Sequence, residues 1–243
     1  MCFILPASVA EALNAYMNFL AGRQSPDYDV NSRVLKLLAI SMKRDISMGV
    51  DEMDEDFAAR LLLRRLPPLF FQPEDELINS IEKTVRDFFD FCDQKHRGKM
   101  NSALNNIGIN IFPELKRIVK LKKLILRFSR NPVISIEPLV VDIEGYRILK
   151  KEKSRETVFL SDEFVFFEFF GRNSVVLKKE GEGGYFLRIY LDSESTAFFR
   201  KGDRIRLKLK RRNDYSSWLI DGVYEIQPVV FDEILNKKGA FVT

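Results

Sequence analysis

The stretch RKGDRIRLKLKRR, which runs from Arg200 to Arg212, decides the fold of the C-terminal half. It begins with a turn, and cationic side chains then alternate with aliphatic ones. The cationic set is Arg204, Arg206, Lys208 and Lys210, and the aliphatic set is Ile205, Leu207 and Leu209. Because successive side chains of a strand point to opposite faces, one face is cationic and the other aliphatic. The pattern predicts a strand that anchors a C-terminal antiparallel sheet.

Further strands are predicted around this one, because short apolar segments alternate with turn residues from Val133 onward. The predicted strands are 139–151, 157–160, 164–170, 174–179, 185–191, 204–210, 217–220 and 223–227. Gly181–Gly184 and Asp221-Gly222 are expected to be hairpin turns. The segment Phe164–Phe170 has no polar face, so we expect it to be covered on both sides. Short, closely spaced strands of this kind favour an antiparallel β-barrel or roll.

The first 130 residues carry the signals of helices. Ser8 and Glu11 have the spacing of a capping box at the start of a helix. The acidic run Asp51–Asp56 precedes Phe57, which suits the start of a helix, and a long helix follows Pro73. The sequence therefore predicts an α+β chain. A helical domain over residues 1–130 packs on a β-barrel or roll domain over residues 131–243.

The cysteine content bears on location. The chain has two cysteines, Cys2 and Cys92, which are too few for a disulfide framework and favour a reducing compartment. The first residues lack the basic region of a signal peptide, and no apolar run approaches the length of a membrane-spanning helix. We therefore expect a soluble cytoplasmic protein.

Positive charge is concentrated in two segments. The net charge of the chain is +4, yet residues 200–212 hold eight basic residues and one acid, Asp203. Residues 95–130 hold ten basic residues and one acid, Glu114. Such segregation is a physical argument about partners, and it points to an anionic one.

The second basic segment contains a predicted helix that begins at Pro113. Its cations follow a 4-3-4-3 spacing, which places them on one stripe of a helix: Lys116, Lys120, Lys123, Arg127 and Arg130. We call this stripe the ridge. It could bind nucleic acid or lie on an anionic membrane surface. The alternative is an outer helix whose apolar side packs on the sheet and whose cations balance the acidic first ninety residues.

The cationic face of the strand 204–210 allows two interpretations. Four cations in a row could follow a phosphate backbone, with Tyr190, Tyr215 or Trp218 stacking on bases if they share that face. Alternatively, the row is the solvated outer face of a sheet, where charged side chains are common and prevent aggregation.

Signals of catalysis and of metal binding are weak. Asp51–Asp56 could supply oxygen ligands, but the spacing of a calcium loop is absent. Cys92 and His96, four residues apart on one helix, could form half of a metal site. Glu168, between Phe167 and Phe169, is the best candidate for a general acid or base with a raised pKa. No nucleophile or phosphate-loop motif accompanies them, so we predict no catalytic residue, metal or cofactor.

One family shares part of the pattern. Asp192-Ser193, followed by Gly202-Asp203 and the alternating strand, resembles part of the PilZ-type barrels, which bind cyclic dinucleotides. That family places an R-x-x-x-R signature before a D/N-x-S-x-x-G signature. Here Arg200 and Arg204 come after Asp192, and Glu194 stands where the second signature has Ser. The chain is therefore not assigned to that family.

The sequence thus predicts a non-enzymatic cytoplasmic binding or regulatory protein with a polyanionic partner, either nucleic acid or a nucleotide. The predicted contacts are Arg204, Arg206, Lys208, Lys210, Lys116, Lys120, Lys123 and Arg127. Two alternatives stay open. One is a protein–protein interaction or structural module with an acidic partner, and the other is a carboxylate-dependent enzyme with a cleft between the two halves.

Overall fold

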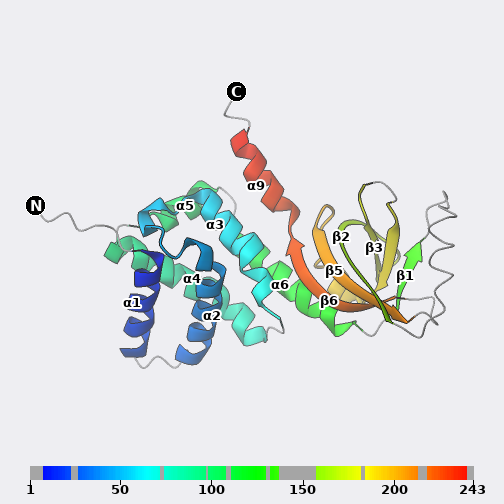
Figure 1. Cartoon of the computed structure of the whole chain (residues 1–243), viewed down its shortest axis with the longest axis horizontal. Coiled ribbons are helices and arrows are strands. Elements are labelled where there is room, and N and C mark those ends of the chain that lie inside the picture. The colour runs from blue at the N-terminus through cyan, green and yellow to red at the C-terminus, as the bar shows by residue number, and fades with distance from the viewer. Residues whose placement is uncertain are drawn as a thin grey trace, which may run out of the picture. The chain divides into compact units, whose positions relative to one another are not determined.

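The computed structural model describes residues 8–22, 27–71, 74–96, 98–107, 111–129, 132–136, 157–181, 184–212 and 218–239. The chain forms two compact units, Met1–Val119 with Val230–Thr243, and Lys120–Val229. The first unit is built of helices and the second holds an antiparallel sheet, which confirms an α+β chain (Figure 1). The divide falls at Val119, inside a helix. The predicted packing of the helical half on the sheet stays a prediction.

The helices of the first unit include three of at least 14 residues: α1 (Val9–Gly22), α2 (Tyr28–Ser41) and α4 (Asp75–His96). Shorter elements are α3 (Glu55–Arg60), α5 (Met100–Asn106), the 3-10 turns η1 (Lys43–Asp45), η2 (Val50–Glu52) and η4 (Pro67–Leu69), and the π turn η3 (Leu61–Arg65). Helix α6 (Ile111–Arg127) continues into the second unit, and α9 (Val229–Gly239) returns to the first.

Two helix starts follow directly from the sequence signals. The Ser8 backbone N–H donates to Glu11 Oε2 at 2.8 Å and the Glu11 N–H donates to Ser8 Oγ at 3.3 Å, which confirms the capping box. The first of these bonds holds the pKa of Glu11 below its ordinary value. Within the acidic run, Asp54 accepts the Phe57 N–H at 2.7 Å and caps α3. The run therefore begins a helix, as predicted.

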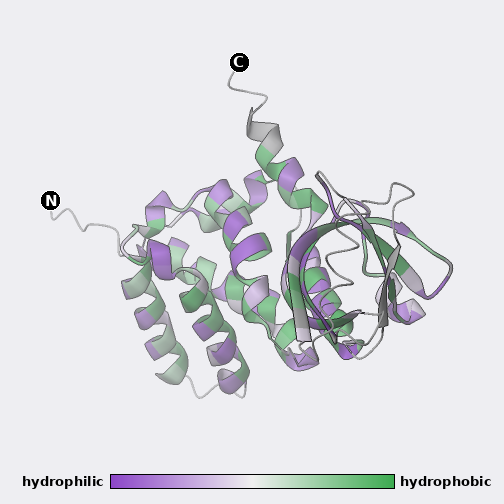
Figure 2. Cartoon of the chain, turned by 45° about the vertical axis from the view of Figure 1, so that its right-hand side comes forward, coloured by the Kyte–Doolittle hydropathy of each residue, from purple (hydrophilic) through white to green (hydrophobic). Residues whose placement is uncertain are grey.

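The core of the first unit gathers aromatic and aliphatic side chains from the inner faces of its helices. The apolar stripes of α1, α2 and α4 alternate with polar residues along each helix (Figure 2). Tyr16 of α1 packs against Phe88 of α4, with ring centroids 5.6 Å apart. Helix α9 adds Phe231 and Ile234 to this core. The last helix of the chain therefore completes a unit that begins with the first.

The second unit contains six described strands, all paired antiparallel. They are β1 (Pro132–Ile136), β2 (Thr157–Phe169), β3 (Ser174–Lys178), β4 (Phe186–Tyr190), β5 (Arg204–Arg212) and β6 (Trp218–Gln227). They pair in the order β1-β4-β3-β2-β5-β6, and β1 also meets β6 through Pro132–Leu219 and Val133–Trp218. One helical turn, α8 (Ser193–Thr196), lies between β4 and β5.

The alternating pattern of β5 is confirmed. Ile205, Leu207 and Leu209 are fully buried, whereas Arg206 between them is exposed. Ile205 lies opposite Phe164 of β2 in the register, and Phe164 is also fully buried. The other face of β5 is therefore the outer surface of the sheet.

Two predictions about the strands are wrong. Asp221-Gly222 is no hairpin turn, because β6 runs unbroken along β5 and shifts register there and again near Tyr224. The segment Phe164–Phe170 is not covered on both sides, since Phe167, Phe169 and Phe170 are all exposed. Strand β1 was not predicted, and the predicted strand 139–151 lies outside the described residues.

Candidate nucleic-acid interface

The predicted cations of β5 lie on the outer face of a three-stranded region formed by β2, β5 and β6. In the register, Arg206 lies between Glu163 on β2 and Glu225 on β6. Lys210 lies between Phe159 and Leu219. The neighbours of the cationic row are therefore acidic at one end and apolar at the other.

Carboxylates neutralise most of this row. The Arg206 guanidinium lies 3.4 Å from the Glu163 carboxylate. The ammonium groups of Lys208 and Lys210 lie 2.8 Å and 3.0 Å from the Asp221 carboxylate. Hydrogen bonds from Lys208 and then Lys210 hold the pKa of Asp221 below its ordinary value, and the bond to Asp221 raises the pKa of Lys208. Arg204 is half-buried at the start of the strand. The predicted cationic face is thus a surface of mixed charge.

Bulges in β6 create this arrangement. Lys208 pairs with Gly222 and Leu209 with Ile220, which leaves Asp221 as the extra residue. In the same way, Arg206 pairs with Glu225 and Leu207 with Val223, which leaves Tyr224 as the extra residue. A bulge turns the side chain of its extra residue away from strict alternation. Asp221 consequently reaches the lysines, and Tyr224 lies on the surface.

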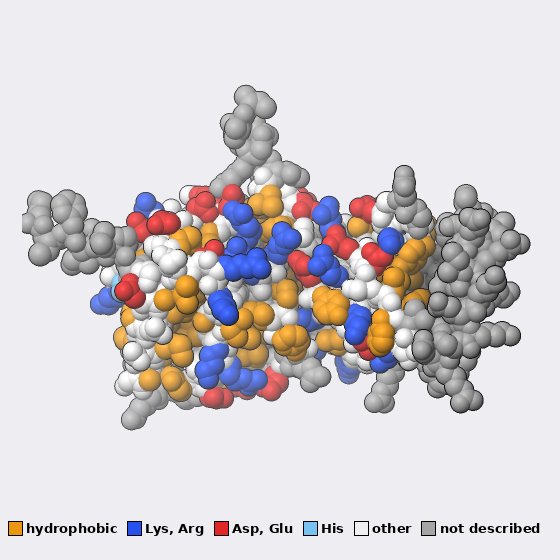
Figure 3. Space-filling model, viewed as in Figure 1, with side chains coloured by type: hydrophobic (Ala, Val, Ile, Leu, Met, Phe, Trp, Pro, Cys, Tyr) orange, Lys and Arg blue, Asp and Glu red, His pale blue; other side chains and the backbone are white. Residues whose placement is uncertain are grey.

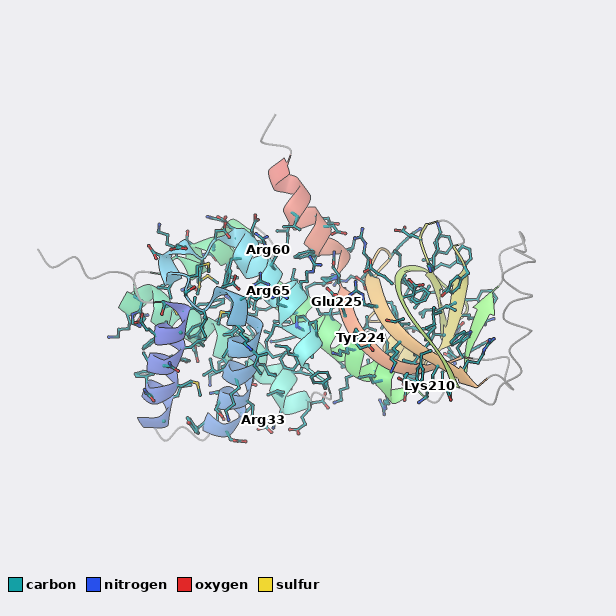
Figure 4. All side chains as sticks on the ribbon, in the orientation of Figure 1. Arg33, Arg60, Arg65, Lys210, Tyr224 and Glu225 are labelled. Carbon is teal, nitrogen blue, oxygen red and sulfur yellow. The ribbon has the colours of Figure 1, made fainter. Side chains whose placement is uncertain are left out.

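Aromatic rings stand on both sides of the cationic row. Tyr224 on β6 is 48% exposed and Phe159 on β2 is 55% exposed. The Lys208 ammonium lies 4.5 Å from the centroid of the Phe159 ring. Figure 4 shows Lys210, Tyr224 and Glu225 along the same pair of strands, and Figure 3 shows apolar, basic and acidic side chains mixed over β5 and β6. Cations and rings therefore share one surface.

The aromatic residues that the sequence suggested for this face are not the ones that occupy it. Tyr190 lies on β4, which does not pair with β5, and Tyr215 lies outside the described residues. Trp218 contacts Arg211, whose guanidinium carbon is 4.9 Å from the indole centroid. Phe159 was missed because its predicted strand gave no sign that it pairs with β5.

The ridge on α6 is also engaged by carboxylates. Lys116 pairs with Glu82 of α4 at 2.7 Å, within the first unit. Lys120 lies 3.6 Å from Glu194 and 4.6 Å from the Phe198 ring centroid, within the second unit. Lys123 is half-buried and Arg127 is exposed, while Arg130 lies outside the described residues. The ridge thus belongs to both units, and its ion pairs join it to Glu82 and Glu194.

The other sides of α6 carry ionisable groups that the stripe pattern did not single out. Glu114 and Arg117 form a buried ion pair one turn apart. Lys122 is 3% exposed, and burial lowers its pKa to about 8. Helix α6 is therefore buried on more sides than an outer helix with one apolar face.

The other candidate chemistry finds no supporting geometry. In the described part of the chain, no three His, Cys, Asp or Glu side chains are grouped to hold a metal ion. Cys92 is fully buried, and burial raises the pKa of its thiol to about 12, which makes it a poor ligand or nucleophile. Glu168 is exposed beside a register shift of β2 and is not buried between its phenylalanine neighbours.

The first unit has an open groove of about 300 Å³. It is lined by Arg33, Lys36, Leu37, Leu69, Phe70, Phe71 and Leu77. Phe71 is 75% exposed, and Arg33 pairs with Glu74 at 3.0 Å. Figure 3 shows apolar side chains gathered on this face of the helices, and Figure 4 labels Arg33 there. The groove combines apolar lining with basic rims.

Compared with models of protein families, with curated proteins and with solved structures, the chain shows no significant match to any. Among the described helices, none combines the length and the apolar character that crossing a bilayer requires.

Proposed function

We propose that this chain is a non-enzymatic cytoplasmic binding protein that holds single-stranded nucleic acid on the outer face of β2, β5 and β6. The observation that carries the proposal is the row from Arg206 to Lys210 between two half-exposed rings, Phe159 and Tyr224. The strand order, with β1 beside β6, supports a small barrel as the scaffold.

Single strands suit this surface better than duplexes. A ring that stacks on a base contributes about 1–3 kcal/mol, and unpaired bases offer their faces for stacking. Tyr224 and Phe159 lie on different strands and flank the cations, so a strand can place its phosphates between two stacked bases. Duplex DNA keeps its bases paired and would use the cations alone.

Electrostatics are expected to contribute modestly here. Four cations (Arg204, Arg206, Lys208 and Lys210) share the surface with three acids, Glu163, Asp221 and Glu225, which leaves a net charge of +1. A phosphate must replace a carboxylate at each paired cation. We therefore expect a shallow dependence of affinity on salt, well below the slope of about 0.9 per phosphate for free cations on duplex DNA.

The test is fluorescence anisotropy of labelled single-stranded DNA, duplex DNA and RNA across a salt series. The variant Phe159→Ser with Tyr224→Ser removes both rings, and we expect it to weaken single-strand binding about 30-fold or more. Tyr28→Ser, which removes an exposed ring from α2 in the other unit, is the matched control and should bind like wild type.

Equal binding by the ring variant and the control would refute the proposal, as would an absence of binding at low salt. In the second case the groove of the first unit becomes the better candidate. Its apolar lining and its basic rims at Arg33 and Lys36 fit an acidic, partly apolar protein segment. Protein–protein interaction is therefore the second candidate function.

A further inference from the structure

The turn between β2 and β3 presents aromatic rings to solvent. Phe169 and Phe170 are 52% and 51% exposed. Gly171 follows with φ of +70°, a conformation that favours glycine, and Phe170 N–H donates to the Ser174 carbonyl at 2.9 Å. Exposed Arg172 completes the turn. Two neighbouring phenylalanines therefore stand at a tight, hydrogen-bonded tip.

A second turn, before β5, brings one further cation beside β2. Gly202 N–H donates to the Phe166 carbonyl at 3.1 Å, and Phe166 N–H donates to the Asp203 carbonyl at 2.8 Å. Exposed Lys201 accordingly lies 5.8 Å from the Phe167 ring centroid. The buried Asp203 carboxylate accepts backbone N–H groups of Arg200 and Val229. Both oxygens of that carboxylate therefore already accept backbone hydrogen bonds.

Arg188 of β4 is held between two rings. Its guanidinium carbon lies 3.7 Å from the Phe170 centroid and 4.6 Å from the Tyr190 centroid. Its Nε donates to Ser174 Oγ at 3.1 Å. Across the described ranges, no carboxylate forms an ion pair with Arg188, Arg172 or Lys201. These three cations differ in this respect from Arg206, Lys208 and Lys210.

We define the hairpin patch as Phe167, Phe169, Phe170, Arg172, Arg188 and Lys201. Each of its three rings already has a neighbour on one side. Phe169 packs on Phe166 at 4.9 Å between centroids, Phe167 packs on Phe186 at 5.5 Å, and Arg188 covers Phe170. The exposed remainder of these rings is apolar and can be buried in an apolar medium.

We propose that the hairpin patch binds the surface of an anionic lipid bilayer. Exposed phenylalanine rings at a turn can enter the boundary between headgroups and acyl chains, and flanking cations meet the lipid phosphates and carboxylates. Each Lys or Arg near such a surface strengthens binding, and one exposed acid on the same strand, Glu168, opposes the three cations of the patch. This inference uses residues other than the proposed nucleic-acid surface and goes beyond it.

The first experiment is flotation of the full chain with vesicles of phosphatidylcholine, with and without phosphatidylserine. We expect binding that requires phosphatidylserine. Arg172→Glu with Lys201→Glu should lower it by about tenfold or more, because two surface cations become anions. Lys43→Glu with Arg44→Glu makes the same charge change at exposed positions of the first unit and should retain binding.

The second experiment reports insertion of the tip directly. The chain has one tryptophan, so Phe169→Trp in a Trp218→Phe background places the only indole at the tip. We expect its emission to shift to the blue with phosphatidylserine vesicles and to be quenched by brominated acyl chains. If the variant is folded and its tryptophan emission does not change when vesicles are added, the proposal is wrong.

The two surfaces can fail separately. Equal vesicle binding by both charge-reversal variants, or none by wild type at low salt, rules out the lipid site and leaves the oligonucleotide result untouched. A different outcome is that the wild-type protein does not bind vesicles and the Arg172→Glu and Lys201→Glu variant loses oligonucleotide binding. In that case the hairpin patch is a nucleic-acid site and the lipid proposal is wrong.

Discussion

The sheet unit carries two cationic surfaces that differ in what faces each cation. On the outer face of β5, Arg206, Lys208 and Lys210 all contact a carboxylate of a neighbouring strand. In the hairpin patch, Arg188 is held by two rings and a hydroxyl group, with no carboxylate contact among the described residues. The longer row of positive charge is therefore the more neutralised of the two.

The difference follows from position in the sheet. Strand β5 lies between β2 and β6, so each of its outer side chains has neighbours on both sides that can supply an acid. The hairpin patch lies at the end of β2 and β3, where Glu168 is the only acid from Phe164 to Asn173. A count of Lys and Arg along one strand therefore says little about the field that a partner meets.

The largest expected effect separates the two faces of β5 itself. Leu207→Ala should destabilise the protein by about 2–5 kcal/mol, because the side chain is fully buried and its loss leaves a cavity. Arg206→Ala, one residue earlier on the exposed face, should cost under about 1 kcal/mol. Urea denaturation of both variants measures the contrast. Similar losses of unfolding free energy in the two variants would mean that the outer ion pairs stabilise the sheet as much as its buried apolar face does.

A buried cation of the same unit gives the next largest effect. Lys122→Met should stabilise the protein by about 1–3 kcal/mol at neutral pH, because the folded state then no longer buries an ammonium whose pKa falls to about 8. Thermal unfolding at several pH values measures it, with Lys123→Met, a half-buried neighbour, as the control.

The pH dependence has a definite sign. The folded-state pKa of Lys122 lies below the ordinary value of 10.5, so the unfolded chain binds more protons between about pH 8 and that value. Wild-type stability from this group rises across that window. The advantage of the Met variant should therefore be largest below about pH 8 and shrink above it. An advantage that does not change with pH would show that packing, not charge, sets the effect.

The smallest effect tests the pairing on β5. Asp221→Asn removes the carboxylate shared by Lys208 and Lys210 and should raise oligonucleotide affinity about two- to tenfold. Stability should fall by less than about 1 kcal/mol, as is usual for surface ion pairs. Anisotropy and urea denaturation measure the two quantities.

The control for this change is Glu76→Gln on α4, which alters the net charge equally at an exposed position of the other unit. An equal rise in affinity for both variants would show that overall charge matters and that the ion pairs on β5 do not.

The sequence predicted what depends on local pattern. The alternation of β5, the capping box of Ser8 and the start of α3 after Asp54 each need only neighbouring residues. The α+β division follows from the same local signals.

Features that depend on the register between strands could not be predicted from the sequence. Asp221-Gly222 has the composition of a hairpin turn, yet the pairing of β6 with β5 makes it a bulge and brings Asp221 to the lysines. Phe159 and Arg188 joined the candidate surfaces only once strand order was known, because their partners lie 49 and 18 positions away, at Lys208 and Phe170. Alternation along a strand predicts which face of the sheet a side chain occupies. It does not predict which residue of the adjacent strand lies beside that side chain.

The placement of α9 has a consequence for how the protein is made. The sheet unit is an insertion within the helical unit, which the chain enters within α6 and leaves after β6. A ribosome completes the whole insertion, up to Val229, before it delivers Phe231 and Ile234 to the helical core. During synthesis the sheet can therefore reach its native state first, while the helical unit, although begun earlier, waits for α9.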